Sequence, residues 1–109
     1  MERIAVCPGS FDPVTLGHLD IFSRASNLFD RVIVLVSKNM MKSHESFTPQ
    51  ERKDMILRVT KNLPNLEVDI FGGLLADYVK DAGAIAIVKG LRAVSAFEYE
   101  FQMALANRK

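Results

Sequence analysis

Residues 7–18 combine a hydroxyl, a histidine and several turn-forming residues between a predicted strand and a predicted helix. Their two glycines and two prolines exclude regular structure and let backbone amides approach a ligand closely. A helix that starts near His18 would add unpaired N–H groups and the positive end of its dipole. Ser10 and His18 could then face one bound anion, which predicts a phosphate site. The composition alone is equally compatible with an ordinary surface loop, and it matches neither a Walker A loop nor a dinucleotide fingerprint.

Basic side chains follow two other predicted strands. Residues 32–36 form a continuous apolar, β-branched run, which is typical of a strand covered on both faces, and a polar loop containing Lys42 follows. Residues 84–88 form a similar strand, and Lys89 and Arg92 stand at its exit. Because the carboxyl ends of parallel strands meet at one edge of a sheet, we expect these cations to lie beside the first loop. Taken one at a time, each lysine is also compatible with a solvated surface charge.

Two lysines, an arginine, a histidine and a hydroxyl around a helix N-terminus suit the transfer of a phosphoryl or nucleotidyl group. Both substrates of such a reaction are anionic, so cations must hold them in line and neutralise the charge that develops on phosphorus. The planar fork of Arg92 suits a phosphate better than a lysine does. No nucleophilic side chain is required, and Cys7, in a predicted buried strand, is expected to be a packed thiol.

The elements that must position these groups alternate along the chain. The predicted strands are residues 4–7, 32–36, 66–71 and 84–88. The predicted helices begin near His18, at a capping box of Thr48 and Glu51, at Leu74 with an end at Gly83, and at a second capping box near Ser95.

The order βαβαβαβα predicts an α/β fold: a Rossmann-like parallel sheet with right-handed crossovers, helices on both faces and a ligand crevice at the carboxyl ends of its strands. On the second helix, Glu51 and Arg52 are expected to cap and solvate the helix rather than to serve a site. The apolar face of this helix is expected to reach Leu63.

Composition limits the possible partners. The 109 residues fit one domain, and 14 basic against 13 acidic side chains leave a net charge of +1. That balance provides no general attraction to nucleic acid or to a membrane surface. No apolar run approaches the roughly 20 residues that cross a bilayer, and the chain starts directly with a strand instead of a signal peptide, so a soluble cytoplasmic protein is expected.

Two motifs carry a resemblance to a known family. Residues 10–18, SFDPVTLGH, resemble the [ST]-F-D-P-x-x-x-G-H signature of the nucleotidyltransferase superfamily. Residues 89–100, KGLRAVSAFEYE, resemble the R-G-[LI]-R-x-x-x-D-[FY]-E-Y-E segment of bacterial phosphopantetheine adenylyltransferases. Together with residues 47–52, FTPQER, the similarity extends over residues 1–109, which are read as one nucleotidyltransferase domain. Glycerol-phosphate cytidylyltransferases and nicotinamide mononucleotide adenylyltransferases share only the first motif.

This resemblance implies transfer of the adenylyl group of ATP to 4'-phosphopantetheine, giving dephospho-coenzyme A and pyrophosphate. It further implies direct attack of the substrate phosphate on the α-phosphorus, and a magnesium ion held through the ATP phosphates rather than by protein ligands. The catalytic residues implied are His18, Ser10, Lys42 and Arg92. The ATP site implied comprises Ser10, Phe11, His18, Gly90, Leu91, Arg92 and Glu100, and the phosphopantetheine site comprises Ser10, Lys42, Leu75 and Lys89.

The sequence departs from the family pattern in three places. Lys89 replaces the usual arginine, and Ala96 replaces the usual aspartate. Members of the family also continue beyond residue 108 into another strand and a serine-rich motif that binds the ATP phosphates, so the domain is expected to be incomplete after its fourth strand and the helix that follows. Two alternatives therefore stay open: a noncatalytic module of the same fold that binds a phosphate ligand, and another adenylyl- or cytidylyltransferase. The family also implies self-association, as a hexamer.

Overall fold

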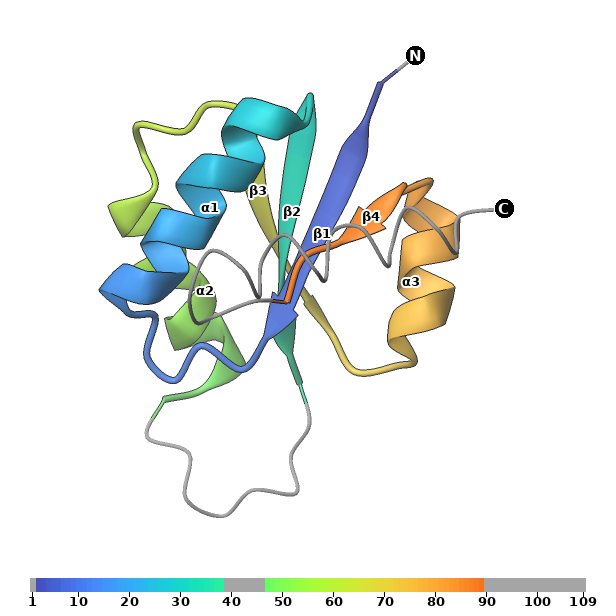
Figure 1. The fold of residues 1–109 in the computed structure, drawn as a ribbon. Helices are drawn as coiled ribbons and strands as arrows, with labels where there is room; N and C mark the ends of the chain where they lie inside the picture. The colour runs from blue at the N-terminus through green and yellow to red at the C-terminus, as the bar shows by residue number, and fades with distance from the viewer. Residues whose placement is uncertain (1, 39–46, 90–109) are drawn as a thin grey trace.

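The computed structural model describes residues 2–38 and 47–89, in which strands and helices alternate (Figure 1). The elements are β1 (Ile4–Gly9), α1 (Leu16–Leu28), β2 (Arg31–Ser37), α2 (Pro49–Val59), β3 (Leu66–Phe71), α3 (Leu75–Ala82) and β4 (Ala86–Ile87). The strands are parallel and form a four-stranded sheet in the order β3-β2-β1-β4. The predicted α/β fold with a parallel sheet is therefore confirmed. The helix expected near Ser95 lies outside the described residues.

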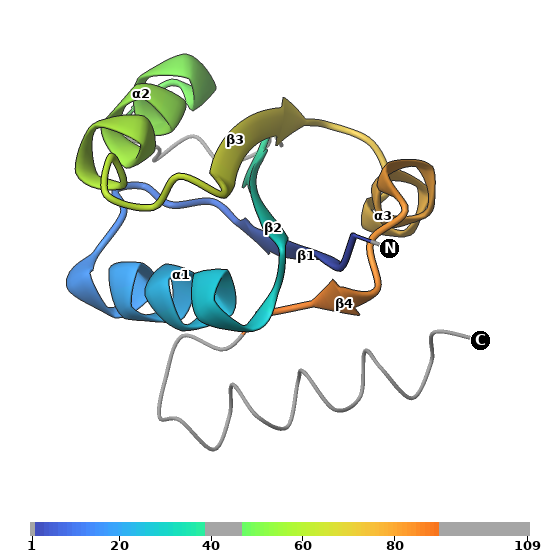
Figure 2. The same cartoon turned by 90° about the horizontal axis from the view of Figure 1, so that it is seen from above.

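The sheet order explains why the helices lie on opposite faces. The connections through α1 and α2 both step from β1 toward β3, whereas the connection through α3 returns past β1 to β4. Right-handed crossovers that run in opposite directions place their helices on opposite faces. Figure 2 shows α1 and α2 on one face of the sheet and α3 on the other. The direction changes between β1 and β4, so the ligand crevice of this topology lies at the carboxyl ends of these two strands.

The apolar run of β2 supplies both halves of the core. Val32, Val34 and Val36 belong to the cluster under α1 and α2, whereas Ile33 and Leu35 belong to the cluster under α3. All five side chains are buried, as expected for a strand covered on both faces.

The thiol of β1 belongs to the same core. Cys7 is fully buried among the residues under α1 and α2, and this burial raises the pKa of its thiol to about 12. The prediction of a packed thiol is confirmed, because a group that keeps its proton at neutral pH is a poor nucleophile.

Helix ends follow their caps. The predicted capping box of Thr48 and Glu51 is present, and α2 starts at Pro49. The helix ends at Val59, four residues before the expected end at Leu63, since Thr60 caps it and donates its hydroxyl to the carbonyl of Ile56 at 2.7 Å. In α3, Gly83 adopts a φ of 72° after the last turn, as a C-cap glycine does.

β4 is shorter than predicted. Its ladder contains only Ala86 and Ile87, although the N–H groups of Ile85 and Val88 also donate to β1 carbonyls. Among the described strands, β4 pairs only with β1, so it has ladder bonds on one side alone.

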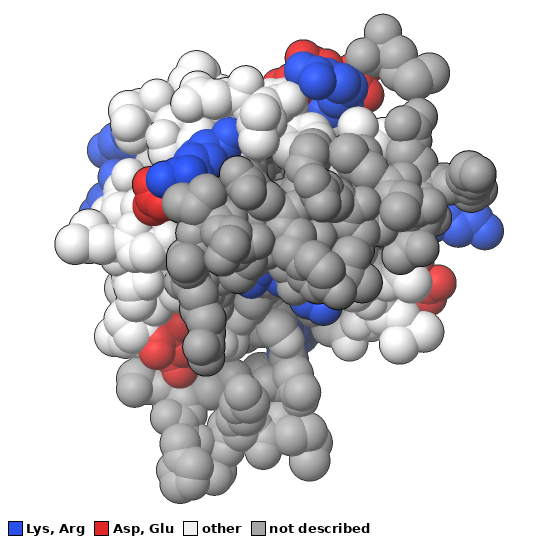
Figure 3. Space-filling model, viewed as in Figure 1, with Lys and Arg blue, Asp and Glu red and all other residues white. Residues whose placement is uncertain are grey.

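Charges of both signs occur on the described part of the surface. On the face in Figure 3, the charged side chains of the described residues stand in separate groups of both signs. Within the described ranges, no helix has the length and apolar character to cross a membrane.

Candidate functional site

The loop between β1 and α1 is held by an aromatic side chain that points inward. Phe11 is only 3% exposed, and its ring packs edge-on against His18 at 4.8 Å and against Phe22 at 5.6 Å. Its φ of 50° lies in the left-handed region, which costs an ordinary residue about 1–2 kcal/mol. Burial of the ring offsets this cost, since an aromatic side chain taken out of water contributes about 1.5–3 kcal/mol.

Gly9 allows this arrangement because it has no side chain. A Cβ at position 9 would lie 2.8 Å from Cζ of Phe11, closer than two carbon atoms approach without displacement. The loop backbone therefore passes directly over the Phe11 ring. Gly9 is the last residue of β1. Ser10 follows it at the carboxyl edge of the sheet and is exposed.

His18 closes a capping box at the start of α1. Thr15 is the N-cap, and its hydroxyl oxygen accepts from the N–H of His18 at 3.3 Å. In return, the N–H of Thr15 donates to Nδ1 of His18 at 2.8 Å. A neutral imidazole that accepts at Nδ1 carries its proton on Nε2. His18 therefore presents a donor, and α1 starts at Leu16, two residues before the expected position.

The protonation of His18 is biased toward the neutral form. Partial burial lowers the pKa of its imidazole. The backbone donor at Nδ1 acts in the same direction, because protonation would place a second hydrogen between the two nitrogens. The sequence motif predicts His18 at this site but not the bond that orients its ring. The signal is a threonine three residues before the histidine, in the spacing of a capping box.

Arg52 lies under the loop, and the expectation that it is solvated is wrong. Its side chain is 0% exposed, and Nη1 donates to the carbonyl oxygen of Ser10 at 2.7 Å. Nε donates to the carbonyl of Thr48 at 3.4 Å. Arg52 faces inward because the N-terminus of α2 packs against the loop, where two backbone carbonyls accept from its Nε and Nη1.

A second contact ties the same segments together. The carboxylate of Asp12 accepts from the N–H of Phe47 at 3.1 Å. The loop after β1 and the start of α2, 35 residues apart in sequence, thus form one unit at the carboxyl edge.

A cavity of about 150 Å³ opens on the α3 side of this edge. It contains Leu75, the residue predicted to contact the pantetheine arm, and Ser37 supplies a hydroxyl group. The remaining walls come from the ends of β1, β2 and β3 and from the segment before α3: Pro8, Gly9, Leu35, Phe71 and Gly73.

Lys89 stands on the other side of β1. It is exposed and follows Val88, whose N–H donates to the carbonyl of Val6 at 2.9 Å. The structure therefore brings Ser10, Phe11, His18, Leu75 and Lys89 to the carboxyl edge. The other predicted site residues lie outside the described residues: Lys42, Gly90, Leu91, Arg92 and Glu100.

The described residues contain no cluster of three or more histidine, cysteine, aspartate or glutamate side chains that could hold a metal ion. The chemistry assembled in residues 2–38 and 47–89 is that of an anion site: a neutral histidine donor, a hydroxyl, a lysine and the N-terminus of a 13-residue helix.

Comparisons with known proteins agree with this chemistry. Residues 6–109 match the cytidylyltransferase-like family. The chain is 58% identical, over 98% of its length, to the phosphopantetheine adenylyltransferase of Caldanaerobacter subterraneus subsp. tengcongensis, of which it covers 66%. It is 55% identical over its whole length to the phosphopantetheine adenylyltransferase of Bdellovibrio bacteriovorus, of which it covers 68%. The chain thus spans about two thirds of the length of these curated relatives.

Solved structures share the fold at low identity. A lipopolysaccharide core biosynthesis protein from Thermoplasma volcanium superimposes with a TM-score of 0.68 at 20% identity, covering 97% of this chain and 88% of that one. A bifunctional NMN adenylyltransferase/ADP ribose pyrophosphatase from Francisella tularensis gives a TM-score of 0.66 at 22% identity, over 94% of this chain and 36% of that one.

Proposed function

Since the chain belongs to the cytidylyltransferase-like family and, within it, to the phosphopantetheine adenylyltransferases, we propose that it transfers the adenylyl group of ATP to 4'-phosphopantetheine. The products are dephospho-coenzyme A and pyrophosphate. The observation that carries the proposal is His18, held as a neutral Nε2–H donor at the N-terminus of α1 against the ring of Phe11, the residue that follows Ser10.

In the proposed reaction, a phosphate oxygen of phosphopantetheine attacks the α-phosphorus of ATP. The new P–O bond forms as the bond to pyrophosphate breaks, and pyrophosphate leaves with the electron pair. His18 donates a hydrogen bond from Nε2 to an oxygen of the reacting phosphate, where negative charge develops. Ser10 and the first N–H groups of α1 bind neighbouring phosphate oxygens, so that the reactants are positioned without a covalent intermediate.

The remaining site residues divide between the substrates. Leu75 and the adjoining cavity fit an apolar arm, and Lys89 fits the substrate phosphate as a point charge. From the family resemblance, Lys42 takes the same phosphate. The same source assigns Gly90, Leu91, Arg92 and Glu100 to ATP. Magnesium would be carried by the ATP phosphates and would neutralise part of their charge.

Turnover measurements test this proposal. Pyrophosphate release should require both ATP and phosphopantetheine, and His18→Ala should lower it at least about 100-fold, the range for loss of a positioned donor. Asn27→Ala, at an exposed position of the same helix, is the matched control and should keep full activity.

Two results would contradict the proposal. Release of pyrophosphate with CTP and not with ATP would indicate a different nucleotidyltransferase. Calorimetric binding of phosphopantetheine without pyrophosphate release from either nucleotide would indicate a noncatalytic phosphate-binding module.

The proposal extends to the assembly and location of the protein. In the described sheet β4 has ladder bonds on one side only, and a strand edge with which another chain can pair favours association. We expect copies of this chain to associate in the cytoplasm, as a hexamer if it follows the family. Sedimentation that shows only monomer at high concentration would contradict this part.

A further inference from the structure

We propose that Thr15 is a positioning residue that fixes the tautomer of His18, so that the ring serves as a neutral donor through Nε2 and never as a proton acceptor. This inference deepens the proposed function and rests on it for the role of the donor. The position of the proton can be measured without turnover, which keeps the two claims separable.

The part of the chain that the structure describes contains two capping boxes with similar geometry and different chemistry. In α2, the N–H of Thr48 donates to a carboxylate oxygen of Glu51 at 2.8 Å, and the N–H of Glu51 donates to the Thr48 hydroxyl at 3.1 Å. In α1, an imidazole takes the place of the carboxylate, with the corresponding distances of 2.8 and 3.3 Å. A carboxylate that accepts this hydrogen bond places no requirement on the protonation of its other oxygen. An imidazole that accepts at Nδ1 must hold its proton at Nε2.

The neighbours of His18 hold its ring in the orientation in which Nδ1 accepts from the N–H of Thr15. The Thr15 hydroxyl oxygen lies 3.0 Å from Nδ1, in addition to the backbone donor. Phe11 meets the imidazole edge-on at 4.8 Å, and Phe22 is nearly parallel to it, at 6.4 Å and 18°. With one nitrogen bound to the cap and the ring held by two aromatic neighbours, Nε2 is the nitrogen that remains for a ligand.

The charged groups on the elements around His18 have partners of their own. On the loop and on α1, Asp12 accepts from the Phe47 N–H, and Asp20 accepts from Arg24. From α2, the guanidinium of Arg52 lies under the loop and adds positive charge there. Burial is the cause of the lowered pKa of His18. Protonation at Nδ1 would require the Thr15 bond to break, so activity should fall on the acid side as His18 gains its second proton.

The experiment compares Thr15→Val with Thr48→Val in the full chain. Each variant removes the hydroxyl of one capping box and keeps the shape of the side chain, so each should lower the melting temperature by a similar amount. Only Thr15→Val should affect His18. We expect its kcat to fall about fivefold, the effect of one lost cap, with the KM for ATP unchanged within about twofold.

The deciding measurement is the ¹⁵N spectrum of the imidazole. Wild-type protein at neutral pH should show a protonated Nε2 and an unprotonated Nδ1. Thr15→Val should show a mixture of tautomers and a His18 pKa about half a unit higher, since the backbone bond to Nδ1 loosens when the first turn frays. The acid limb of the kcat profile should move up by the same amount. Thr15→Ser should restore both values.

Two outcomes would overturn the proposal. The first is wild-type protein with the proton on Nδ1 or with a charged ring at neutral pH, a result that needs no variant. The second is a Thr15→Val protein that loses stability as Thr48→Val does while its tautomer and acid limb stay unchanged, which would make the cap purely structural. A chain that shows the expected tautomer but releases no pyrophosphate would contradict the proposed function and leave the role of Thr15 intact.

Discussion

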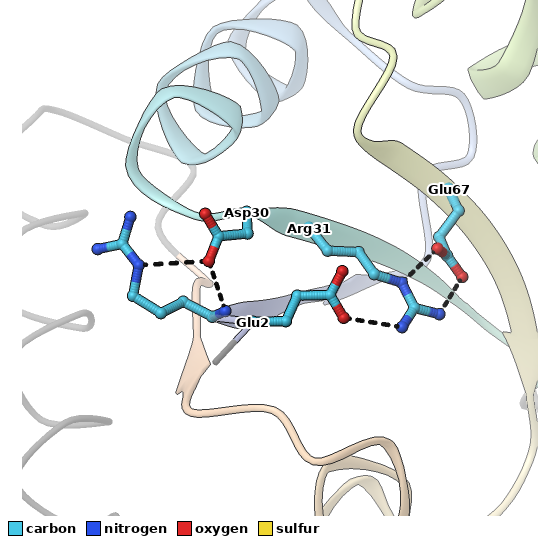
Figure 4. A network of polar contacts seen from close by, with 5 residues as sticks. Glu2, Asp30, Arg31 and Glu67 are labelled. Carbon is cyan, nitrogen blue, oxygen red and sulfur yellow. Dashed lines mark hydrogen bonds and ion pairs between the residues drawn. The ribbon is translucent and has the colours of Figure 1, made fainter.

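At the amino ends of the strands, charged side chains bind one another (Figure 4). Arg31 makes two hydrogen bonds to Glu67, at 2.6 and 2.9 Å, and lies 3.8 Å from Glu2. At the carboxyl ends, polar side chains bind the backbone instead. Arg52 donates to the Ser10 carbonyl at 2.7 Å, and His18 accepts from the backbone of its own helix cap.

The difference shows that the polar contacts at the amino ends of the strands serve stability, whereas those at the carboxyl ends also position the groups of the candidate site. The side chains of the ion pairs at the amino ends are between 37% and 58% exposed, and such pairs contribute about 1 kcal/mol or less each. Side chains that bind the backbone fix the position of a loop, and His18 in addition keeps its second nitrogen for a ligand. Changes at the carboxyl ends should therefore alter both activity and stability, and changes at the amino ends should alter stability alone.

The largest effect is expected from Arg52→Met. Methionine fills part of the volume but removes the side-chain donor to the Ser10 carbonyl, whereas the Thr48 carbonyl keeps its bond to the backbone N–H of residue 52. A buried acceptor without a partner costs about 1–3 kcal/mol. We expect a loss of about 2–4 kcal/mol in the free energy of unfolding, measured with urea, together with a lower kcat as the Ser10 loop shifts. Arg58→Met, at an exposed position of the same helix, should cost less than about 1 kcal/mol. Equal losses of unfolding free energy in the two variants would show that the buried contacts of Arg52 do not stabilise the loop.

Features that depend on neighbouring residues could be predicted from the sequence, whereas features that depend on contacts between distant segments could not. The apolar run of β2, the Thr48 and Glu51 box and the turn at Gly83 are local patterns, and the structure confirms all three. The burial of Arg52 depends on contact with a carbonyl 42 residues away, which no local pattern reveals. The left-handed conformation of Phe11 is similarly hidden, because packing against α1 overrides the usual backbone preference.

An intermediate effect is expected from alanine at two glycines of the carboxyl edge. At Gly9, a Cβ would lie 2.8 Å from Cζ of Phe11, which is buried against His18. Overpacking of this kind costs about 1–3 kcal/mol, and displacement of the ring should lower kcat by moving His18. At Gly73, a Cβ would lie equally close, at 2.8 Å, to Cζ of Phe71 on the cavity wall. Gly73→Ala should therefore raise the KM for phosphopantetheine and leave kcat near its original value.

Steady-state kinetics with both substrates distinguish these two alanine variants. A Gly9→Ala protein with unchanged kcat would show that the Phe11 ring does not hold His18. It would also weaken the contrast between the two ends of the sheet, because a tightly packed loop would then have no catalytic consequence.

The smallest effect is expected from Arg31→Met at the amino ends. The hydrogen bond from Arg31, followed by its charge, lowers the pKa of the Glu67 carboxyl below its usual value of 4.5. A carboxyl with a lowered folded-state pKa contributes stability that is present above pH 4.5 and is lost as the pH falls through the lowered value. Wild-type protein should thus exceed Arg31→Met in unfolding free energy by less than about 1 kcal/mol at pH 7, and the difference should shrink as the pH falls below 4.5. Added salt should reduce this difference in stability at pH 7 as well, since both partners are exposed to solvent.

Pyrophosphate release should be unchanged in Arg31→Met, because the ion pairs lie at the end of the sheet opposite to His18. A drop in activity at equal stability would show that the two ends are coupled through the strands, contrary to the separation that their contacts indicate.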